Sequence, residues 1–197
     1  PTSIYNSKSG ALNHKKLFPL SLKKFVIFNG YKELQINYID KSKKELKLLS
    51  LNRWHPDKDL KLMFKALNLV KKKGIKFELD MYGDNINYKN VELINLIKSF
   101  NLENNVKVFG LNKNINKVIN KYDYHLLSSK SDTFPNVVCE TMLLGVPNIV
   151  TDVGDCKSIV GKDGWVTPPE NAMLFAKSII NASSIFRTCL LYTSDAA

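Results

Sequence analysis

Two carboxylates, a Phe-Pro turn and a following helix form the part of the sequence best suited to chemistry. Asp132 and Glu140 lie in the stretch 131–155, SDTFPNVVCETMLLGVPNIVTDVGD. The residues after Pro135 predict a helix, and the first turn of a helix carries unpaired N–H groups and a positive dipole end that favour an anion. Glu140, one turn inside the helix, is unsuited to phosphate but could accept hydrogen bonds from sugar hydroxyls. The stretch therefore predicts a pocket for a nucleotide sugar.

A loop with two cations offers the complementary charge. Arg53 and Lys58 lie in LNRWHPDKD, between the first predicted core strand and the helix that follows it. A loop after a parallel strand opens at the carboxyl edge of the sheet, where α/β proteins bind their ligands. Two cations there would neutralise a diphosphate and stabilise its developing charge as a leaving group. The alternative is that both are solvated surface charges, and His55 in this loop either touches the same ligand or faces solvent.

The stretch 131–155 resembles the donor-site signature of glycosyltransferase family 4 and its relatives, enzymes of the GT-B fold. The family pattern is roughly E-G-F-P-x-x-x-x-E-A-M-A-x-G-x-P-V-V-x-T-x-x-G, and this chain differs at the first Glu, here Asp132, and at the following Gly, here Thr133. The matching positions are Phe134, Pro135, Glu140, Met142, Gly145, Pro147, Thr151 and Gly154, with Ile149 as a conservative replacement. Thr141 and Leu143 stand at the two Ala positions, and Asn148 replaces an apolar residue. Because the spacing is kept along the whole stretch, the match is specific.

The resemblance implies a role for each group. In the family, the Glu that corresponds to Glu140 holds the ribose hydroxyls of the donor nucleotide, and the residue that corresponds to Asp132 approaches the transferred sugar. Backbone N–H groups around Thr133 face the sugar and the phosphate. The cationic loop is similar to the family's G-R-x-x-x-x-K-G, whose Arg and Lys grip the donor diphosphate, with Asn52 where Gly is usual. The catalytic residues expected from this are Arg53, Lys58 and Asp132, and the expected donor-binding residues are Glu140, Thr133, Phe134, Pro135, Asn136, Val137, Gly110 and Ser129.

Some of these residues also have a purely structural explanation. Gly110 either closes a strand near the nucleobase or simply forms a turn, and Ser129 with its neighbouring serines either offers hydroxyls or belongs to a strand-end turn. Asp132 is also a candidate helix cap, and Asp155 a candidate turn residue. His125 lies inside an apolar run, so we expect a buried core histidine there rather than a base.

Alternating strands and helices from Leu46 onward predict an α/β fold, a Rossmann-like parallel sheet with helices on both faces. By resemblance, this is the C-terminal half of a GT-B fold. The first helix is predicted to end at Gly74 and to carry apolar residues at helical spacing, namely Leu60, Met63, Phe64, Leu67 and Val70. The predicted strands are 46–51, 76–83, 106–110, 124–129 and 148–151, and the other predicted helices are 91–100, 115–121, 136–144 and 171–182.

Three regions are expected along the chain. Residues 1–44 resemble the end of the N-terminal domain and the interdomain linker of GT-B enzymes, through N-S-x-x-G-x-x-x-H from Asn6 and VIFNGY at 26–31. Residues 45–188 are expected to form the domain that binds the nucleotide sugar. Residues 189–197, CLLYTSDAA, resemble the translated read-through of a sequencing adapter, with a genuine frayed C-terminus as the alternative. Because the chain lacks an initiator Met, we expect a fragment without its N-terminal domain.

Composition narrows the class of protein and its partners. The net charge of +11 indicates either an anionic partner or an AT-rich coding sequence, because only Arg53 and Arg187 among the 29 basic residues are arginines. The aromatic residues do not interleave with a basic stripe, so no nucleic-acid partner is expected. No apolar run is long enough to span a membrane, and no secretory signal opens the sequence. Three cysteines without an even framework predict reduced thiols, a cytoplasmic protein and no zinc site.

The combined prediction is a retaining glycosyltransferase of the hexosyltransferase type, which by resemblance needs no metal or other cofactor. Its donor is a nucleoside-diphosphate sugar, and its acceptor is a glycan or lipid-linked sugar bound through the N-terminal domain, in polysaccharide or glycoconjugate biosynthesis. The isolated chain is expected to bind nucleotide weakly and to transfer nothing. Peripheral association with the inner face of the membrane is left open. The alternatives are a GT-B nucleotide-sugar epimerase, a non-catalytic nucleotide-sugar-binding module and a basic nucleic-acid-binding Rossmann domain.

Overall fold

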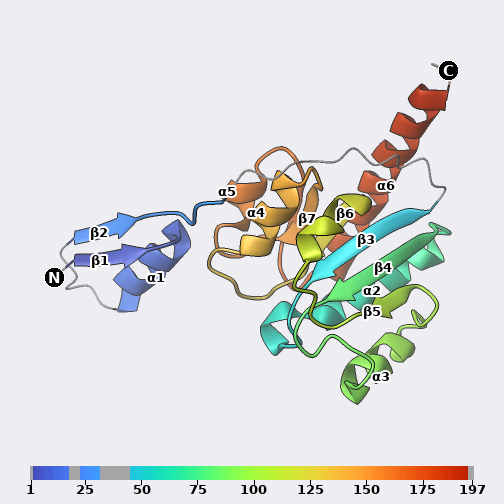
Figure 1. Cartoon of the computed structure of the whole chain (residues 1–197), viewed down its shortest axis with the longest axis horizontal. Coiled ribbons are helices and arrows are strands. Elements are labelled where there is room, and N and C mark those ends of the chain that lie inside the picture. Colours follow the sequence, from blue (N-terminus) through green and yellow to red (C-terminus); the bar gives the residue numbers. More distant parts are fainter. Residues whose placement is uncertain (1, 18–22, 32–44, 195–197) are drawn as a thin grey trace.

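Six parallel strands form the main sheet of the protein, in the order β5-β4-β3-β6-β7-β8 (Figure 1). The structure, a computed structural model, describes residues 2–17, 23–31 and 45–194. The strands are β3 (Leu46–Leu51), β4 (Phe77–Tyr82), β5 (Val106–Val108), β6 (Tyr124–Leu127), β7 (Asn148–Thr151) and β8 (Trp165–Thr167). The prediction of a parallel, Rossmann-like sheet is confirmed.

Helices cover both faces of this sheet, as predicted. They are α2 (Leu60–Lys72), α3 (Val91–Ser99), α4 (Asn136–Leu143), α5 (Cys156–Val160) and α6 (Ala172–Ser194). The larger core lies on the face that α2, α3 and α6 cover, and its largest fully buried side chains include Phe64 and Phe175. On the opposite face α4 and α5 pack against β6 and β7 through a smaller apolar cluster that includes Val138 and Val150.

The structure differs from the predicted elements in three places. The region 115–121 forms two 3₁₀ turns, η2 (Ile115–Lys117) and η3 (Ile119–Lys121), instead of one helix. Neither α5 nor β8 was predicted, because five and three residues are too few to show a helical or strand period. The last helix continues to Ser194 instead of ending near 182; the origin of residues 189–197 stays a prediction.

Residues 2–17 and 23–31 form a separate βαβ unit, which we call the N-terminal arm. Strand β1 (Thr2–Tyr5) pairs in parallel with β2 (Lys23–Val26), and α1 (Lys8–Leu17) connects them. In Figure 1 the arm extends away from the main sheet on the side of α4 and α5. Its assignment to a preceding domain stays a prediction, and the linker residues 32–44 lie outside the described part of the chain.

The strand order reverses direction between β3 and β6, which opens a crevice at the carboxyl ends of these strands. Only two register pairs join them, Leu48 with Tyr124 and Leu49 with His125. Beyond this point the backbone N–H of Leu51 donates to Nε2 of His125 at 3.4 Å. The imidazole thus satisfies a backbone donor at the point where the two strands part.

His125 belongs to a buried polar trio with Asn148 on β7 and Thr141 on α4, all with no exposed side-chain surface. Its Nδ1 lies 2.6 Å from Oδ1 of Asn148, which also lies 3.0 Å from the hydroxyl of Thr141. Because Nε2 accepts from Leu51, Nδ1 carries the proton and donates to Asn148. The expectation of a buried core histidine is confirmed, and the trio explains why Thr141 and Asn148 replace Ala and an apolar residue.

Acid is expected to destabilise the fold through His125. Burial lowers the pKa of His125 from 6.5 to about 4. As the pH falls, this histidine is therefore protonated in the unfolded chain before it is protonated in the folded one. Its effect on the free energy of unfolding is absent above about pH 6.5 and grows to a loss of about 3 kcal/mol by about pH 4. Urea unfolding measured across this range tests the prediction. In His125→Gln this part of the pH dependence should disappear, and an unchanged slope would contradict the assignment.

Gly154, between β7 and α5, allows two loops to approach closely. Its φ of +57° is in the left-handed region, and a Cβ atom there would lie 2.4 Å from the carbonyl oxygen of Asp132 and 2.5 Å from that of Thr133. Since real Cβ atoms do not approach oxygen so closely, only glycine fits at this position. Its presence in the signature is therefore explained by packing against the loop that carries Asp132.

Replacing Gly154 by Ala should destabilise the protein by more than the cost of placing an alanine in the left-handed conformation. The matched control is Gly74→Ala, with a φ of +75° but no atom within 4 Å of the new Cβ. We expect a loss of about 1 kcal/mol in the control, from the left-handed conformation. In Gly154→Ala we expect about 3 kcal/mol or more, because two carbonyl groups must also move. Equal unfolding free energies in urea would show that the two loops do not constrain each other.

Candidate functional site

The loop between β3 and α2, residues 52–59, holds Lys58 in a well-defined turn. Its 3₁₀ turn η1 (Pro56–Lys58) begins after His55, whose Nδ1 accepts from the backbone N–H of Asp57. Asp59 follows in the left-handed conformation, and its carboxylate caps α2 by accepting from the N–H of Leu62. One residue therefore ends the turn and begins the helix, which leaves the backbone at Lys58 little freedom.

The loop between β6 and α4, residues 128–135, is hydrogen-bonded to the first loop. The hydroxyl of Ser128 donates to the carbonyl of Lys58, at 2.8 Å. The backbone N–H of Lys130 donates to the carbonyl of Asp57 at 2.7 Å. These bonds join two segments that are about seventy residues apart in sequence, and they bring the predicted cation and carboxylate to the same place.

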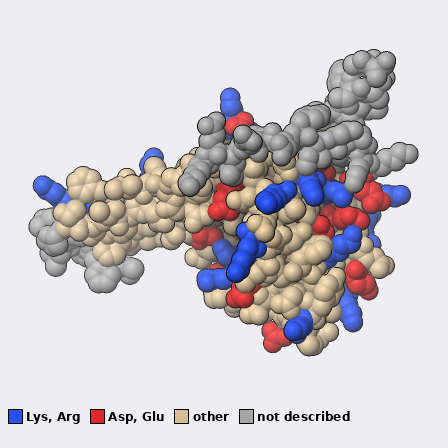
Figure 2. Space-filling view, in the orientation of Figure 1, with Lys and Arg blue, Asp and Glu red and all other residues tan. Residues whose placement is uncertain are grey.

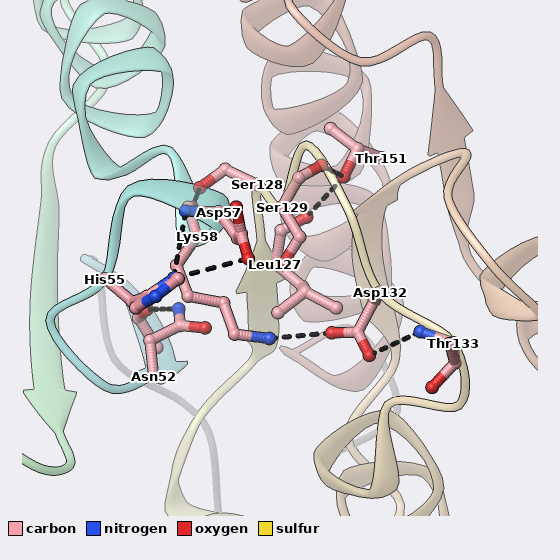
Figure 3. Close-up of polar contacts among 11 residues, drawn as sticks. Asn52, His55, Asp57, Lys58, Leu127, Ser128, Ser129, Asp132, Thr133 and Thr151 are labelled. Atoms are coloured by element: carbon pink, nitrogen blue, oxygen red, sulfur yellow. Dashed lines mark hydrogen bonds and ion pairs between the residues drawn. The ribbon is translucent and has the colours of Figure 1, made fainter.

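Lys58 and Asp132 form an ion pair with 2.7 Å between Nζ and Oδ2 (Figure 3). The other carboxylate oxygen of Asp132 accepts from the backbone N–H of Thr133 at 2.9 Å. Both side chains are largely shielded from solvent, with 18% and 14% of their surface exposed. Two residues predicted to act on opposite parts of a donor are thus paired directly with each other.

Helix α4 directs its N-terminus toward this pair. Pro135 occupies the capping position and no side chain caps the helix. The alternative that Asp132 is merely a helix cap is therefore wrong, because its carboxylate bonds Lys58 and Thr133 instead. An uncapped helix start favours an anion through its free N–H groups and its dipole.

A cleft of about 470 Å³ lies between these elements. Of the predicted site residues, those that line it are Arg53, Lys58, Asp132, Phe134, Pro135, Asn136, Val137 and Glu140. Glu140 forms part of the wall as a half-buried side chain, and Arg53 is exposed at the rim. The lining of the cleft thus combines two cations and a helix start with three carboxylates, those of Asp84, Asp132 and Glu140.

Three predicted residues do not line the cleft. Thr133 lies directly beside it, with its carbonyl engaged by the backbone N–H of Asp155. Gly110 adopts a φ of +76° and exchanges backbone hydrogen bonds with Ile86 and Gly83, so the structure gives it a turn geometry. Ser129 is fully buried and its hydroxyl has no partner among the described residues, a position that does not favour contact with a ligand.

Seven lining residues were not predicted to be part of the site: Leu51, Asn52, Gly83, Asp84, Leu111, Asn112 and Ile115. Asn52 is 5% exposed, and its Nδ2 donates to the hydroxyl of Ser50 at 2.7 Å. Its Oδ1 has no partner within the described ranges. The sequence signal that could have pointed to Asn52 is its presence where the family usually has Gly. Leu111 and Asn112 follow Gly110, so the predicted turn did indicate the right segment.

Charge and metal-binding groups are distributed as follows. Lys, Arg, Asp and Glu side chains are interspersed on the face drawn in Figure 2. Within residues 2–17, 23–31 and 45–194, no three His, Cys, Asp or Glu side chains gather as a metal would require. None of the helices in that part of the chain combines the length and the apolar character needed to cross a bilayer.

Solved glycosyltransferase structures share this fold. A mutant of TarM of S. aureus, in complex with fondaparinux, α-GlcNAc-glycerol and UDP, superimposes with a TM-score of 0.78 and 20% identity over 91% of this chain and 36% of its own. HepE of Anabaena, in complex with UDP and glucose, gives 0.76 and 22% over 95% of this chain and 54% of its own. A glycosyltransferase from Rickettsia africae gives 0.80 and 20% over 95% and 54%. This chain therefore spans between about a third and about half of these proteins.

Sequence comparison identifies the family. A comparison with curated proteins found no significant match. The family described as "Glycosyl transferases group 1" matches residues 32–185, a range that includes the whole main sheet, both loops and the cleft. The protein therefore belongs to the glycosyl transferases of group 1.

Proposed function

We propose that this chain is the donor-binding part of a retaining glycosyltransferase that takes a nucleoside-diphosphate sugar. The observation that supports the proposal most is the meeting of Lys58, Asp132 and the uncapped start of α4 at one cleft that Glu140 also lines. The assignment to family 4 rests on the signature from Asp132 to Gly154. The transferred group would be a hexosyl residue.

The cleft suggests how the donor lies. The diphosphate would occupy the end with Arg53, Lys58 and the α4 N-terminus, where positive charge stabilises it both when bound and as the leaving group. The ribose would hydrogen-bond Glu140, and the base would lie near Gly110 and the lining residue Leu111. Because two cations and a helix dipole supply the positive charge, no metal ion is required in this proposal.

UDP is the first nucleotide to test, since the TarM and HepE structures contain it. The acceptor would be a glycan or lipid-linked sugar, held by a part of the protein outside these 197 residues. We therefore propose that the chain alone binds the nucleotide weakly and transfers no sugar. A cytoplasmic enzyme of polysaccharide or glycoconjugate synthesis, with peripheral contact at the inner face of the membrane, fits this donor chemistry.

Two variants should separate the phosphate end of the cleft from the ribose end. Lys58→Ala should weaken UDP and inorganic pyrophosphate about tenfold or more, because a charged hydrogen bond is lost. Glu140→Ala should weaken UDP by a similar factor and leave pyrophosphate unchanged. Calorimetric titration measures both, with the exposed Lys65→Ala and Glu103→Ala as charge-matched controls. UDP binding that neither site variant changes would exclude this cleft as the donor site.

Asp132→Asn should strengthen the binding of UDP, whereas Lys58→Ala and Glu140→Ala should weaken it. The amide can still accept from the N–H of Thr133, but it no longer pairs with Lys58 or repels the diphosphate. We expect UDP to bind about fivefold more tightly, the size of effect that a nearby charge produces in a partly exposed site. Titration at low and high salt checks the electrostatic origin. Weaker binding would mean that the carboxylate contacts the nucleotide favourably.

A further inference from the structure

The carboxylate of Asp155 lies at the N-terminus of helix α1, far away in the sequence. Its Oδ2 accepts from the backbone N–H of Lys8 at 2.8 Å, and its Oδ1 accepts from that of Ser9 at 2.9 Å. Asp155 is 5% exposed, and although it precedes α5, its side chain does not cap that helix. The carboxylate therefore caps α1 of the arm instead of its own helix α5. The sequence had suggested only a turn residue at this position.

Asp155 satisfies donors that have no acceptor within α1. The first N–H groups of a helix point away from it and need an external acceptor. Ser7 supplies one through its hydroxyl, which accepts from Gly10 at 2.9 Å. Asp155 supplies acceptors for Lys8 and Ser9, and its negative charge also complements the positive end of the helix dipole. Without Asp155, two amides at a positively polarised end would lose their protein acceptor.

The same residue is bonded to the β6–α4 loop. The backbone N–H of Asp155 donates to the carbonyl of Thr133 at 2.9 Å, and the hydroxyl of Ser9 donates to that carbonyl at 3.1 Å. Thr133 in turn donates its N–H to Asp132, which pairs with Lys58. A continuous series of hydrogen bonds thus runs from the start of α1 to the lysine in the cleft.

A second contact joins the arm to the same site. The side-chain carbonyl of Asn136, in the first turn of α4, accepts from Nδ2 of Asn29 at 2.6 Å and from the hydroxyl of Tyr31 at 2.7 Å. Burial raises the pKa of Tyr31, so its hydroxyl stays protonated and can donate. The ring of Phe28 also lies 5.8 Å from that of Phe134. The arm therefore touches both the loop and the helix that form the cleft.

We propose that Asp155 is a positioning residue that couples the N-terminal arm to the cleft. With α1 docked on its carboxylate, Thr133 is held in the place from which its N–H orients Asp132 beside Lys58. Displacement of the arm would release Thr133 and disorder the pair, so the position of the arm would set the affinity for the diphosphate. This last step rests on the proposed donor site, whereas the docking itself does not.

Amide hydrogen exchange followed by NMR tests the docking on the complete chain. In Asp155→Ala, the N–H groups of Ser9 and Thr133 should exchange at least tenfold faster, while those of the central strand β3 stay protected. The matched control is Asp152→Ala, which removes the same charge from an exposed residue three positions earlier. Unchanged exchange at Thr133 in Asp155→Ala would overturn the proposal.

A variant on the α1 side of the Asp155 contact distinguishes a loss of this contact from misfolding of the main domain. Lys8→Pro removes the donor to Oδ2 of Asp155 without touching the main domain, and proline is tolerated at the first position of a helix. Lys8→Ala is its control, because it removes the same side chain and keeps the N–H. Lys8→Pro should also accelerate exchange at Thr133 at least tenfold, and combining it with Asp155→Ala should add little. Full additivity would show that the two residues act independently and contradict the coupling.

UDP titration of the same variants tests the final step. Asp155→Ala and Lys8→Pro should weaken UDP at least threefold, because they loosen the loop at the start of α4 while Asp132, unlike in Asp132→Asn, keeps its negative charge. Asp152→Ala and Lys8→Ala should leave UDP binding unchanged. If exchange at Thr133 accelerates but the Kd for UDP stays constant, the coupling does not reach the cleft and the proposal is wrong. If the unmodified chain binds no UDP, the proposed function fails, while exchange at Thr133 still decides whether Asp155 orders the loop.

Discussion

The divergence of β3 and β6 at the carboxyl edge of the sheet is the constraint on which the rest of the site depends. At a reversal of strand order the loops that follow two neighbouring parallel strands turn to opposite sides of the sheet, which leaves a crevice outside the carboxyl ends of the strands. Here the ladder ends at Leu49 and His125, and the N–H of Leu51 is bonded by an imidazole. The space that opens beyond this point holds both charged loops, and the hydroxyl of Ser128 joins them again.

Lys58 is already paired with a carboxylate before any ligand arrives. Removing a lysine and an aspartate from water is unfavourable, by several kcal/mol per ion when burial is deep. The 2.7 Å contact between Lys58 and Asp132 and the N–H of Thr133 offset that cost. An incoming diphosphate must therefore compete with Asp132 for Lys58. The shorter reach of Asp compared with Glu fits this local pairing, since its second oxygen is fixed by the adjacent backbone.

The sequence predicted features that depend on neighbouring residues, but it did not predict contacts between segments that are far apart along the chain. Strands such as 46–51 and the helix from Leu60 were predicted because burial imposes a period on neighbouring residues. Lys58 and Glu140 were predicted to belong to one site, and both line the cleft. The α1–Asp155 contact could not be predicted, because nothing local in either segment shows which carboxylate meets which helix end. Asn52 was recognised only as a departure from a family pattern, since its burial depends on Ser50 and the fold around it.

The polar trio beneath α4 has a consequence for how this sequence can evolve. His125 and Asn148 are fully buried and bond each other, so either one alone would leave a buried polar group unpaired, whereas the hydroxyl of Thr141 also lies within bonding distance of the carbonyls of Val137 and Val138. Replacing Asn148 by an apolar residue would cost about 1–3 kcal/mol unless His125 changed as well. The intermediate sequences on that path are less stable than either end, so positions 125 and 148 are expected to change together among related proteins. The identity of residue 148 in a relative should then indicate which residue occupies position 125.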